Sequence, residues 1–419
     1  MQYIVVGAGL AGLACAKVFL ESGREVVVYD GSDDVGGRVR TDLVNGYTLD
    51  RGFQVLFDAY PAVNRLCDLH ALNLKAFQSG AIVCARGVRT PLVDPRRGAS
   101  AEDFAATVFT SRIPWQDKVR LLHLCWQLSR SRAGDATLST QSTREYLLTL
   151  GFSSDTMEYF FEPFCGGILL DRGLSASSGL FQFYFSMLYR GGACLPMGGI
   201  GTIAQVLAEP LRTKKCLRLN SQVEALVMDD DRVMGVRFAS GDTVYADNVV
   251  LAVDAGSAAR LTNSTPPPAE PGVSVAYFSA SQSVWKSRLI ALNANRNAFV
   301  NNAQMLSSVS SSYAPEGMHL LGASILGIPD LTDDEVFARS LSDLKEMFRG
   351  DSYAQDALNG CSPLRVYRIP NAQPAQPPGK RWNLDNAPAG LVVAGDWTCS
   401  GSINGALLSG ERAARGLVA

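Results

Sequence analysis

Three glycines close to the N-terminus have the spacing of a phosphate-binding turn. They belong to a G-x-G-x-x-G pattern made of Gly7, Ala8, Gly9, Leu10, Ala11 and Gly12. In such a turn the first glycine permits a tight bend, the second lets a pyrophosphate approach the backbone, and the third allows close packing of a helix on a strand. Asp30 follows 18 positions after Gly12, where a carboxylate can accept hydrogen bonds from both ribose hydroxyls of an adenosine. The pattern predicts that the chain binds a dinucleotide.

A β-strand, a helix and a second strand must position these glycines. Residues 2–6 and 25–29 are short apolar runs typical of buried strands, and the second run ends at Asp30. Between them, residues 13–22 form an apolar helical stretch that stops at Gly23. The start of that helix would offer free N–H groups and a positive dipole end to the phosphates. These residues leave NAD and FAD both open, whereas Asp30 disfavours NADP because its carboxylate would face the 2′-phosphate.

A second glycine-rich segment follows the second strand. Residues 34–41 read Asp-Val-Gly-Gly-Arg-Val-Arg-Thr and resemble the R-x-G-G-R-x-x-[ST] motif of the flavin amine oxidase and phytoene desaturase superfamily. The resemblance implies that Gly36 and Gly37 approach the cofactor closely and that Arg38 lies near its pyrophosphate. Asp34 departs from the motif, because it replaces the first arginine. The alternative interpretation is a plain glycine turn with a solvated arginine.

Residues 50–54 resemble a further segment of this superfamily, which passes beside the flavin ring. The resemblance implies that Gly52, Phe53 and Gln54 lie near the ring, and glycine suits such a close approach of the backbone. The alternative is a β-turn followed by a strand over residues 53–57, with no role in binding.

The middle of the chain continues the resemblance in the family's order. Residues 195–201 are similar to the P-x-G-G segment that returns the chain to the cofactor domain, and Val223 stands where the family's backbone contacts the adenine. Residues 199–204 also match G-x-G-x-x-A. Because no strand precedes them, we expect no second nucleotide site there. A buried strand is predicted over residues 247–252.

The C-terminal residues complete the resemblance. A predicted strand over residues 391–394 leads into Gly395 and Asp396. In the family this acid hydrogen-bonds the ribityl and pyrophosphate region. A helix is predicted to begin near Asn404, and its dipole would stabilise negative charge on the N1 edge of a reduced flavin. The cofactor-binding residues implied here are Gly395, Asp396, Ile403, Asn404, Gly405 and Ala406. Together with the earlier segments, they favour FAD as the cofactor.

The expected fold is therefore α/β, with a Rossmann-type, glutathione-reductase-like FAD-binding domain and a discontinuous α+β substrate domain. The 419 residues are more than one compact core usually holds. The resemblance implies an FAD-binding domain made of residues 1–75, 195–260 and 385–419. Residues 76–194 and 261–384 would then form the substrate-binding domain.

The composition argues against several other classes of protein. Lys and Arg total 38 against 40 Asp and Glu, which gives no strongly basic surface for a nucleic acid. The nine cysteines have no C-x-x-C spacing and the three histidines lie far apart, so we expect neither a disulfide framework nor a metal site. No apolar run reaches 18 residues, and the glycine-interrupted N-terminus lacks a basic start. We therefore expect a cytoplasmic protein without a signal peptide or a membrane-spanning helix.

Two segments of the expected substrate domain each permit two interpretations. The many aromatic residues between 159 and 189 would line an apolar tunnel or, as is commoner, form ordinary core. Residues 115–130 predict an amphipathic helix with Trp115, Val119, Leu122 and Trp126 on one stripe, flanked by Lys118, Arg120, Arg130 and Arg132. The commoner arrangement places this stripe in the core. The other makes it a peripheral membrane contact, through which a lipid-soluble substrate enters.

The resemblance implies hydride transfer from a substrate to flavin N5, and three functions stay open. The first, towards which the aromatic segment leans, is a desaturase or dehydrogenase acting on a small hydrophobic, isoprenoid-like substrate. The second is an amine or amino acid oxidase, and the third is a non-redox isomerase or an FAD-stabilised binding protein.

No catalytic residue can be assigned from the sequence, because flavin hydride transfer needs no dedicated nucleophile. Amine oxidases commonly place a lysine near flavin N5, and Lys286 is the nearest candidate, although its context matches poorly. Only one nucleotide site is visible, so oxygen or a quinone is the expected electron acceptor. The sequence predicts no oligomeric state.

Overall fold

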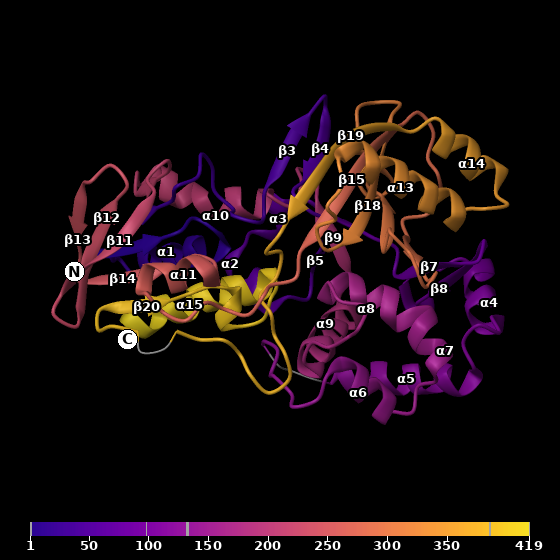
Figure 1. Ribbon diagram of the computed structural model, residues 1–419, viewed down its shortest axis with the longest axis horizontal. Coiled ribbons are helices and arrows are strands. Elements are labelled where there is room, and N and C mark those ends of the chain that lie inside the picture. The colour runs from indigo at the N-terminus through magenta and orange to yellow at the C-terminus, as the bar shows by residue number, and fades with distance from the viewer. Residues whose placement is uncertain (1, 98, 131–133, 385–386, 419) are drawn as a thin grey trace.

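The chain folds into two lobes, which lie side by side along the long axis of the molecule (Figure 1). The computed structural model describes residues 2–97, 99–130, 134–384 and 387–418. Both ends of the chain lie in the same lobe, at the left of the figure.

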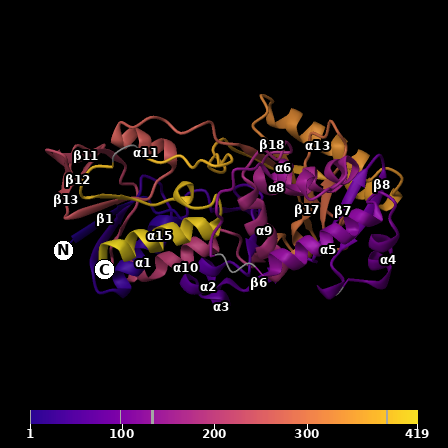
Figure 2. The ribbon, with the colours of Figure 1, turned by 90° about the horizontal axis from the view of Figure 1, so that it is seen from below.

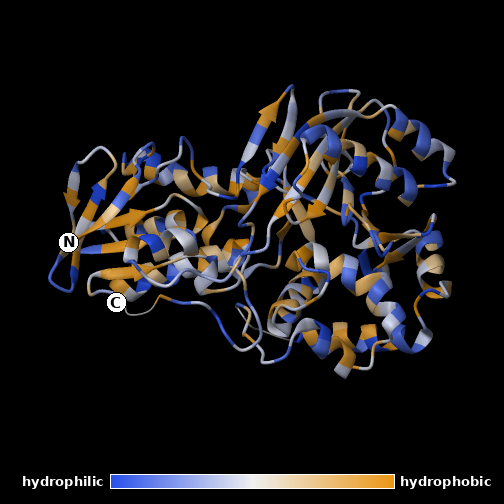
Figure 3. Cartoon of the chain, viewed as in Figure 1, coloured by the Kyte–Doolittle hydropathy of each residue, from blue (hydrophilic) through white to orange (hydrophobic). Residues whose placement is uncertain are grey.

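The first lobe is built on a five-stranded parallel sheet. Its strands, in spatial order, are β10 (Leu217–Arg218), β2 (Glu25–Tyr29), β1 (Gln2–Val6), β14 (Asn248–Leu251) and β20 (Leu391–Val393). They are mostly Val, Ile and Leu because both faces of a parallel sheet are covered, and Figure 3 shows them largely in orange. Because β1 pairs with β14 and β14 pairs with β20, this sheet joins segments from both ends and from the middle of the chain.

Helices cover one face of this sheet and a small antiparallel sheet covers the other. The helices are α1 (Leu10–Glu21), α10 (Thr202–Thr213) and α15 (Ile403–Val418), and α1 packs against the other two (Figure 2). The antiparallel sheet consists of β11 (Val223–Asp229), β12 (Arg232–Phe238) and β13 (Thr243–Tyr245). Successive side chains of β1 point to opposite faces of the parallel sheet. Val5 packs with the helices on one face, and Ile4 packs with β12 on the other.

The second lobe contains a seven-stranded sheet. In spatial order its strands are β19 (Ser362–Ile369), β15 (Val273–Ala280), β18 (His319–Leu326), β17 (Asn302–Met305), β16 (Ile290–Asn293), β7 (Gly80–Ala85) and β8 (Val88–Val93). Within this sheet β16 and β7 pair in parallel, and the other neighbouring strands pair antiparallel. Helices α13 (Asp333–Met347) and α14 (Ser352–Asn359) cover one face, with Phe278, Leu344 and Phe348 in the shared core.

A group of helices completes the second lobe below the sheet (Figure 1). They are α4 (Ala101–Phe109), α5 (Trp115–Ser129), α6 (Thr143–Thr149), α7 (Ser154–Thr156), α8 (Glu162–Leu169) and α9 (Ser178–Arg190), with a π-helical turn at Met157–Phe161. The helix predicted over residues 115–130 forms as α5. The helix predicted over residues 13–22 begins three residues earlier, because the phosphate-binding turn itself enters the helix at Leu10.

The remaining elements are short. They are β3 (Thr41–Val44), β4 (Tyr47–Asp50), β5 (Leu56–Phe57), β6 (Leu74–Ala76), β9 (Ala193–Pro196), α2 (Pro61–Leu66), α3 (Leu69–Leu72), α11 (Ala255–Thr262), α12 (Leu306–Val309) and 3₁₀ turns at Pro95–Arg97, Ser311–Tyr313 and Asp396–Thr398. The alternative prediction of a strand over residues 53–57 is correct only for Leu56 and Phe57, which pair with β9. It is wrong for residues 53–55.

A buried carboxylate joins several of these short elements. Asp50, at the end of β4, accepts hydrogen bonds from the Thr41 hydroxyl (2.6 Å), the Ile200 N–H (2.9 Å) and the Tyr313 hydroxyl (2.9 Å). The Gly201 N–H in turn donates to Thr41. The G-x-G-x-x-A match at residues 199–204 is thus occupied by contacts within the chain. Burial raises the pKa of Asp50 to about 6, and these hydrogen bonds partly offset the rise.

Asp50 makes the stability of the chain depend on pH in a predictable direction. The folded state holds the Asp50 proton up to about pH 6, whereas an unfolded aspartate loses it near pH 4. Stability therefore falls as the pH rises through this window, by about 3 kcal/mol for this group. Denaturant titrations of the wild type and of Asp50→Asn measure this effect. We expect the difference between their unfolding free energies (wild type minus variant) to fall by this amount between pH 4 and 7. A difference that is constant with pH would contradict the prediction.

Candidate functional site

One large cavity runs from the β1–α1 turn into the second lobe. Its volume is about 1640 Å³. Most of the predicted cofactor residues line it, namely Gly7, Gly9, Leu10, Ala11, Asp30, Gly36, Gly37, Arg38, Gly52, Phe53, Gln54, Val223, Gly395, Asp396, Ile403 and Ala406. Three others, Gly12, Asn404 and Gly405, lie behind the wall. The tertiary structure thus brings segments from the whole chain to one cavity.

The β1–α1 turn has the geometry that its glycines predict. Gly7 has a φ of +107°, and a Cβ there would lie 2.5 Å from the Ala252 carbonyl oxygen. A Cβ at Gly12 would lie 1.9 Å from the Gly7 carbonyl oxygen, so this glycine is needed for helix packing. A Cβ at Gly9 would meet no heavy atom within 4 Å, because Gly9 faces the cavity. The start of α1, with no side-chain cap at Gly9, therefore borders open space.

Asp30 is held at the end of β2 by backbone donors. Its carboxylate accepts hydrogen bonds from the N–H groups of Ala8 (2.6 Å) and Ser32 (2.7 Å) while lining the cavity. An ionised carboxylate has further lone pairs after accepting two hydrogen bonds. It can therefore still accept ribose hydroxyls.

The second glycine segment touches the first. Gly36 donates its N–H to the Ala8 carbonyl, and a Cβ at Gly37 would lie 3.5 Å from the Gly9 Cα. Gly36 and Gly37 have φ values of +112° and +59°, which glycine adopts without strain. The two turns together make a narrow backbone cradle that larger residues would fill.

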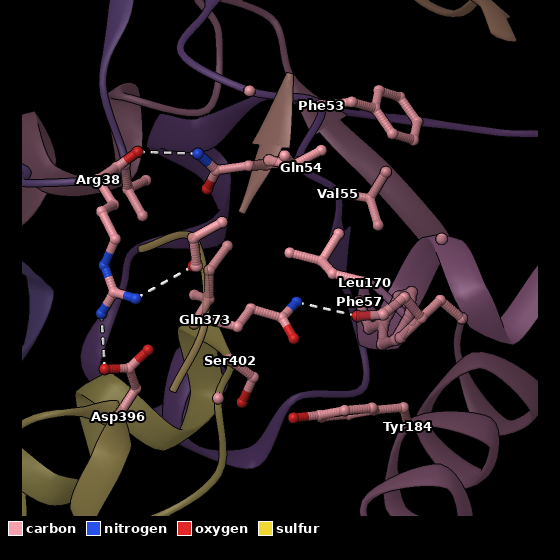
Figure 4. Close-up of a pocket in the computed structure, with 18 of the residues that line it drawn as sticks. Arg38, Phe53, Gln54, Val55, Phe57, Leu170, Tyr184, Gln373, Asp396 and Ser402 are labelled. Carbon is pink, nitrogen blue, oxygen red and sulfur yellow. Dashed lines mark hydrogen bonds and ion pairs between the residues drawn. The ribbon is translucent and has the colours of Figure 1, made fainter. Parts of the chain in front are cut away.

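Arg38 reaches across the cavity to the C-terminal segment. Its guanidinium donates to Asp396 Oδ1 (2.6 Å) and to the Ala372 carbonyl (3.1 Å), as the dashed lines in Figure 4 show. Burial by itself would lower the pKa of Arg38, but the Asp396 carboxylate more than compensates and raises it. A permanent cation thus lies beside the cradle. The interpretation of Arg38 as a freely solvated side chain is wrong.

The departure from the family motif at Asp34 is accommodated outside the cavity. The Asp34 carboxylate accepts hydrogen bonds from Gln205 Nε2 (2.9 Å) and Arg212 Nη2 (3.2 Å), both on α10. Asp34 therefore anchors the glycine segment to a neighbouring helix and places no negative charge in the cradle.

Residues 52–54 follow the cavity wall. Gly52 has a φ of +95°, and Gln54 Nε2 donates to the carbonyls of Arg38 (2.8 Å) and Arg51 (3.1 Å). Gln54 thereby fixes this segment to the second glycine segment (Figure 4).

The C-terminal helix contributes one face to the cavity and another to packing. α15 begins at Ile403, one residue before the predicted start, and Ile403 and Ala406 line the cavity. Asn404 faces α2 instead, where it accepts the Ala62 N–H (2.9 Å) and donates to the Gly134 carbonyl (3.1 Å). A Cβ at Gly405 would lie 1.9 Å from the Ser400 carbonyl oxygen. Asn404 and Gly405 thus shape the helix start from behind.

Two residues of the cavity wall, Gln373 and Ser402, gave no signal in the sequence. Figure 4 shows Gln373 and Ser402 pointing into the space between Arg38 and Tyr184. Gln373 Nε2 donates to the Ile168 carbonyl (2.9 Å). Burial raises the pKa of Tyr184 well above its ordinary value, so its hydroxyl stays protonated. Gln373 lies in an irregular segment between β19 and β20, where neither periodicity nor a motif marks it.

Beyond these residues the cavity enters the second lobe and becomes apolar. Its walls there come from β7, β8, β16, the helices and the loop before α5. They include Ala81, Leu92, Ile113, Leu121, Phe160, Phe164, Ile168, Phe185, Leu188, Ile290 and Leu292. Of the aromatic residues between 159 and 189, Phe160, Phe164, Tyr184, Phe185 and Tyr189 line this tunnel. Phe161, Phe181 and Phe183 are buried in the core, so each interpretation of this segment is correct for part of it.

The lysine suggested for the flavin region lies elsewhere. The Lys286 ammonium is 5.5 Å from the centroid of the Tyr353 ring and is absent from the cavity wall. Lys118 is the only lysine among the described residues of that wall, and its ammonium donates to the carbonyls of Val108 (2.6 Å) and Thr110 (2.7 Å). The placement of Lys286 beside the cofactor is therefore wrong.

The first half of the cavity fits a dinucleotide that carries a flavin. The cradle of Gly9 and Gly37, the start of α1 and the cation of Arg38 suit a pyrophosphate. Asp30 suits an adenosine ribose at one end, and residues 52–54 with the start of α15 suit a flat ring at the other. The fold and the site thus define a flavoprotein of the Rossmann type.

Comparisons with known proteins identify the family. The model of the flavin-containing amine oxidoreductases matches residues 10–418, and the chain belongs to this family. The cofactor is therefore FAD, and the predicted fold class is confirmed.

Individual relatives are distant. The zeta-carotene-forming phytoene desaturase of Myxococcus xanthus is 25% identical over 291 residues, in a match that covers 60% of this chain and 53% of the desaturase. Polyamine oxidase 3 of rice is 25% identical over 269 residues, in a match that covers 60% of this chain and 51% of the oxidase. These matches span about half the length of the relatives. A solved oxidoreductase of Methanosarcina mazei, 18% identical, superposes with a TM-score of 0.76 over 98% of this chain and 99% of its own.

Proposed function

We propose that this chain is an FAD-dependent dehydrogenase or desaturase that takes a hydride from a CH–CH bond of a hydrophobic, isoprenoid-like molecule. The observation that carries the proposal is the apolar tunnel that continues from the cofactor half of the cavity. In this proposal residues 1–75, 195–260 and 385–419 bind FAD, residues 76–194 and 261–384 bind the substrate, and oxygen or a quinone accepts the electrons.

The tunnel suits a long apolar molecule better than a cation. Its charged wall residues in the second lobe are Asp94, Arg96 and Lys118. Asp94 and Arg96 form an ion pair, and the Arg96 guanidinium stacks 3.6 Å from the centroid of the Tyr189 ring. The Lys118 ammonium is hydrogen-bonded to two backbone carbonyls. The rest of the wall offers mainly aliphatic and aromatic contacts, which favour an apolar substrate through burial of its surface.

The chain contributes position and environment to the reaction. FAD supplies the hydride acceptor when it is bound. The tunnel walls orient the substrate and exclude water, and Arg38 holds a positive charge at the pyrophosphate. Gln54 and Gln373, which are fixed by hydrogen bonds to backbone carbonyls, keep the polar edge of the cavity rigid.

Amine oxidation is the second candidate, because the family includes amine oxidases such as the rice polyamine oxidase. Lys286, the lysine that would have supported amine oxidation, does not line the cavity. An isomerase is the third candidate, since a UDP-galactopyranose mutase shares the fold with a TM-score of 0.67.

An anaerobic titration of the FAD-loaded protein separates the three functions. The flavin absorbance is followed while amines, amino acids or detergent-solubilised polyenes are added. We expect bleaching by a polyene and none by amines. Bleaching by a primary or secondary amine would move the assignment to amine oxidation. No bleaching by any donor, with isomerisation only after chemical reduction of the flavin, would support the third candidate.

A further inference from the structure

One part of the second lobe exposes an unusual concentration of large apolar side chains. Fifteen such side chains are exposed among the described residues, and seven of them lie between residues 104 and 126. We define the α4–α5 surface by these seven residues, Phe104, Val108, Phe109, Trp115, Val119, Leu122 and Trp126. It lies at the end of the molecule far from both termini (Figures 1 and 2).

Helix α5 is apolar on two opposite faces. Leu124 and Leu128 are buried on the face that packs towards α9. Trp115, Val119, Leu122 and Trp126 follow helical spacing on the other side, where Trp115 is 69% exposed and Leu122 is 70% exposed. The expectation that this stripe faces the core is therefore wrong. A second apolar face without a partner is typical of a helix that contacts a membrane or another protein.

The α4–α5 surface surrounds the outer end of the tunnel. Phe104, Val108 and Leu122 are exposed and also line the cavity. The hydrogen bonds from Lys118 to the Val108 and Thr110 carbonyls fasten the end of α4 to α5. An apolar molecule held against this surface would thus meet the tunnel without crossing water.

The charge around the surface selects the kind of partner. Between residues 94 and 130, six basic residues stand against four acidic ones, although the whole chain has a net charge of -2. Asp94 pairs with Arg96 and Asp117 pairs with Arg120, which leaves four basic residues against two acidic ones. The basic residues are Arg96, Arg97, Arg112, Lys118, Arg120 and Arg130, and the Arg130 guanidinium lies 3.8 Å from the Trp126 ring centroid. Arg132 lies outside the described residues.

We propose that the α4–α5 surface docks on a lipid bilayer that contains anionic phospholipid, and that the substrate passes from this bilayer into the tunnel. Tryptophans and basic residues beside an apolar face suit the headgroup region of such a bilayer. None of the described helices combines the length and the hydropathy that a transmembrane span needs. The substrate route rests on the proposed function, whereas the docking does not.

Co-sedimentation with vesicles tests the docking on the FAD-loaded protein without substrate. We expect binding to phosphatidylcholine vesicles with about one third phosphatidylglycerol, weaker binding to pure phosphatidylcholine, and a decrease with salt. Phe109 and Trp115 are 83% and 69% exposed and do not line the cavity. The double variant Phe109→Ser/Trp115→Ser should therefore keep its fold and FAD content, and bind the anionic vesicles at least about tenfold more weakly.

The control variant removes equally exposed apolar side chains elsewhere. Leu43 on β3 and Tyr245 on β13 are 77% and 63% exposed, and Leu43→Ser/Tyr245→Ser should bind the vesicles as the wild type does. Wild-type protein that does not sediment with vesicles, or equal sedimentation of Phe109→Ser/Trp115→Ser, would overturn the proposal. The proposal would also fail if the wild type bound no vesicles but formed a dimer in sedimentation velocity, and if Phe109→Ser/Trp115→Ser abolished that dimer. These results are independent of flavin bleaching by a polyene in detergent. That experiment tests the proposed function separately.

Discussion

Replacing Gly9 with valine is expected to abolish FAD binding while the chain still folds. A Cβ at Gly9 meets no heavy atom of the protein within 4 Å, and the extended backbone of this residue (φ −70°, ψ 175°) suits valine. The added methyl groups would instead fill the space that we assign to the pyrophosphate. We expect the affinity for FAD to fall by more than about a thousandfold, because the phosphates would lose their approach to the start of α1.

Flavin released on denaturation and isothermal titration of the apoprotein measure this effect, with far-UV circular dichroism as the check on folding. Gly416→Ala is the matched control, because a Cβ at this glycine of α15 also meets no heavy atom within 4 Å, yet Gly416 does not line the cavity. Gly416→Ala should retain its FAD. A Gly9→Val protein with a full complement of FAD would refute the placement of the cofactor.

Placing a carboxylate in the tunnel is expected to have the largest effect on turnover. Ile290, on β16, lines the apolar part of the cavity and is not among the residues assigned to FAD. An ionised aspartate there would face an apolar substrate without a partner, which costs about 4 kcal/mol or more. We therefore expect Ile290→Asp to lower kcat/KM for a polyene by about a thousandfold. The FAD content should stay unchanged.

Ile290→Val and the choice of substrate make this experiment selective. Ile290→Val keeps the wall apolar and should change kcat/KM by less than about tenfold. If the natural substrate were an amine, the new carboxylate would attract its ammonium group and Ile290→Asp would raise kcat/KM for amines. An unchanged rate with the polyene would mean that the tunnel near β16 does not hold the substrate.

The cofactor half of the molecule was largely predictable from the sequence, because its signals are local. The glycine motifs at residues 7–12 and 36–37 are short patterns in the sequence, and each lies directly beside the strand or helix that it serves. The resemblance of these segments to one family then indicated FAD as the cofactor and the class of fold. Asn404 and Gly405 were less predictable, because the side of a helix start that faces a ligand depends on what packs behind it.

The sequence by itself thus determined a dinucleotide-binding βαβ unit, an α/β fold and the FAD-containing family. The tertiary structure decided which of two apolar faces of α5 is buried, where Lys286 lies, and that Gln373 and Tyr184 share a wall with Arg38. It also decided that Asp50 is buried beside Thr41, Ile200 and Tyr313. The physical reason is that periodicity fixes which residues share a face of an element, whereas the long-range packing of strands and helices fixes what that face meets.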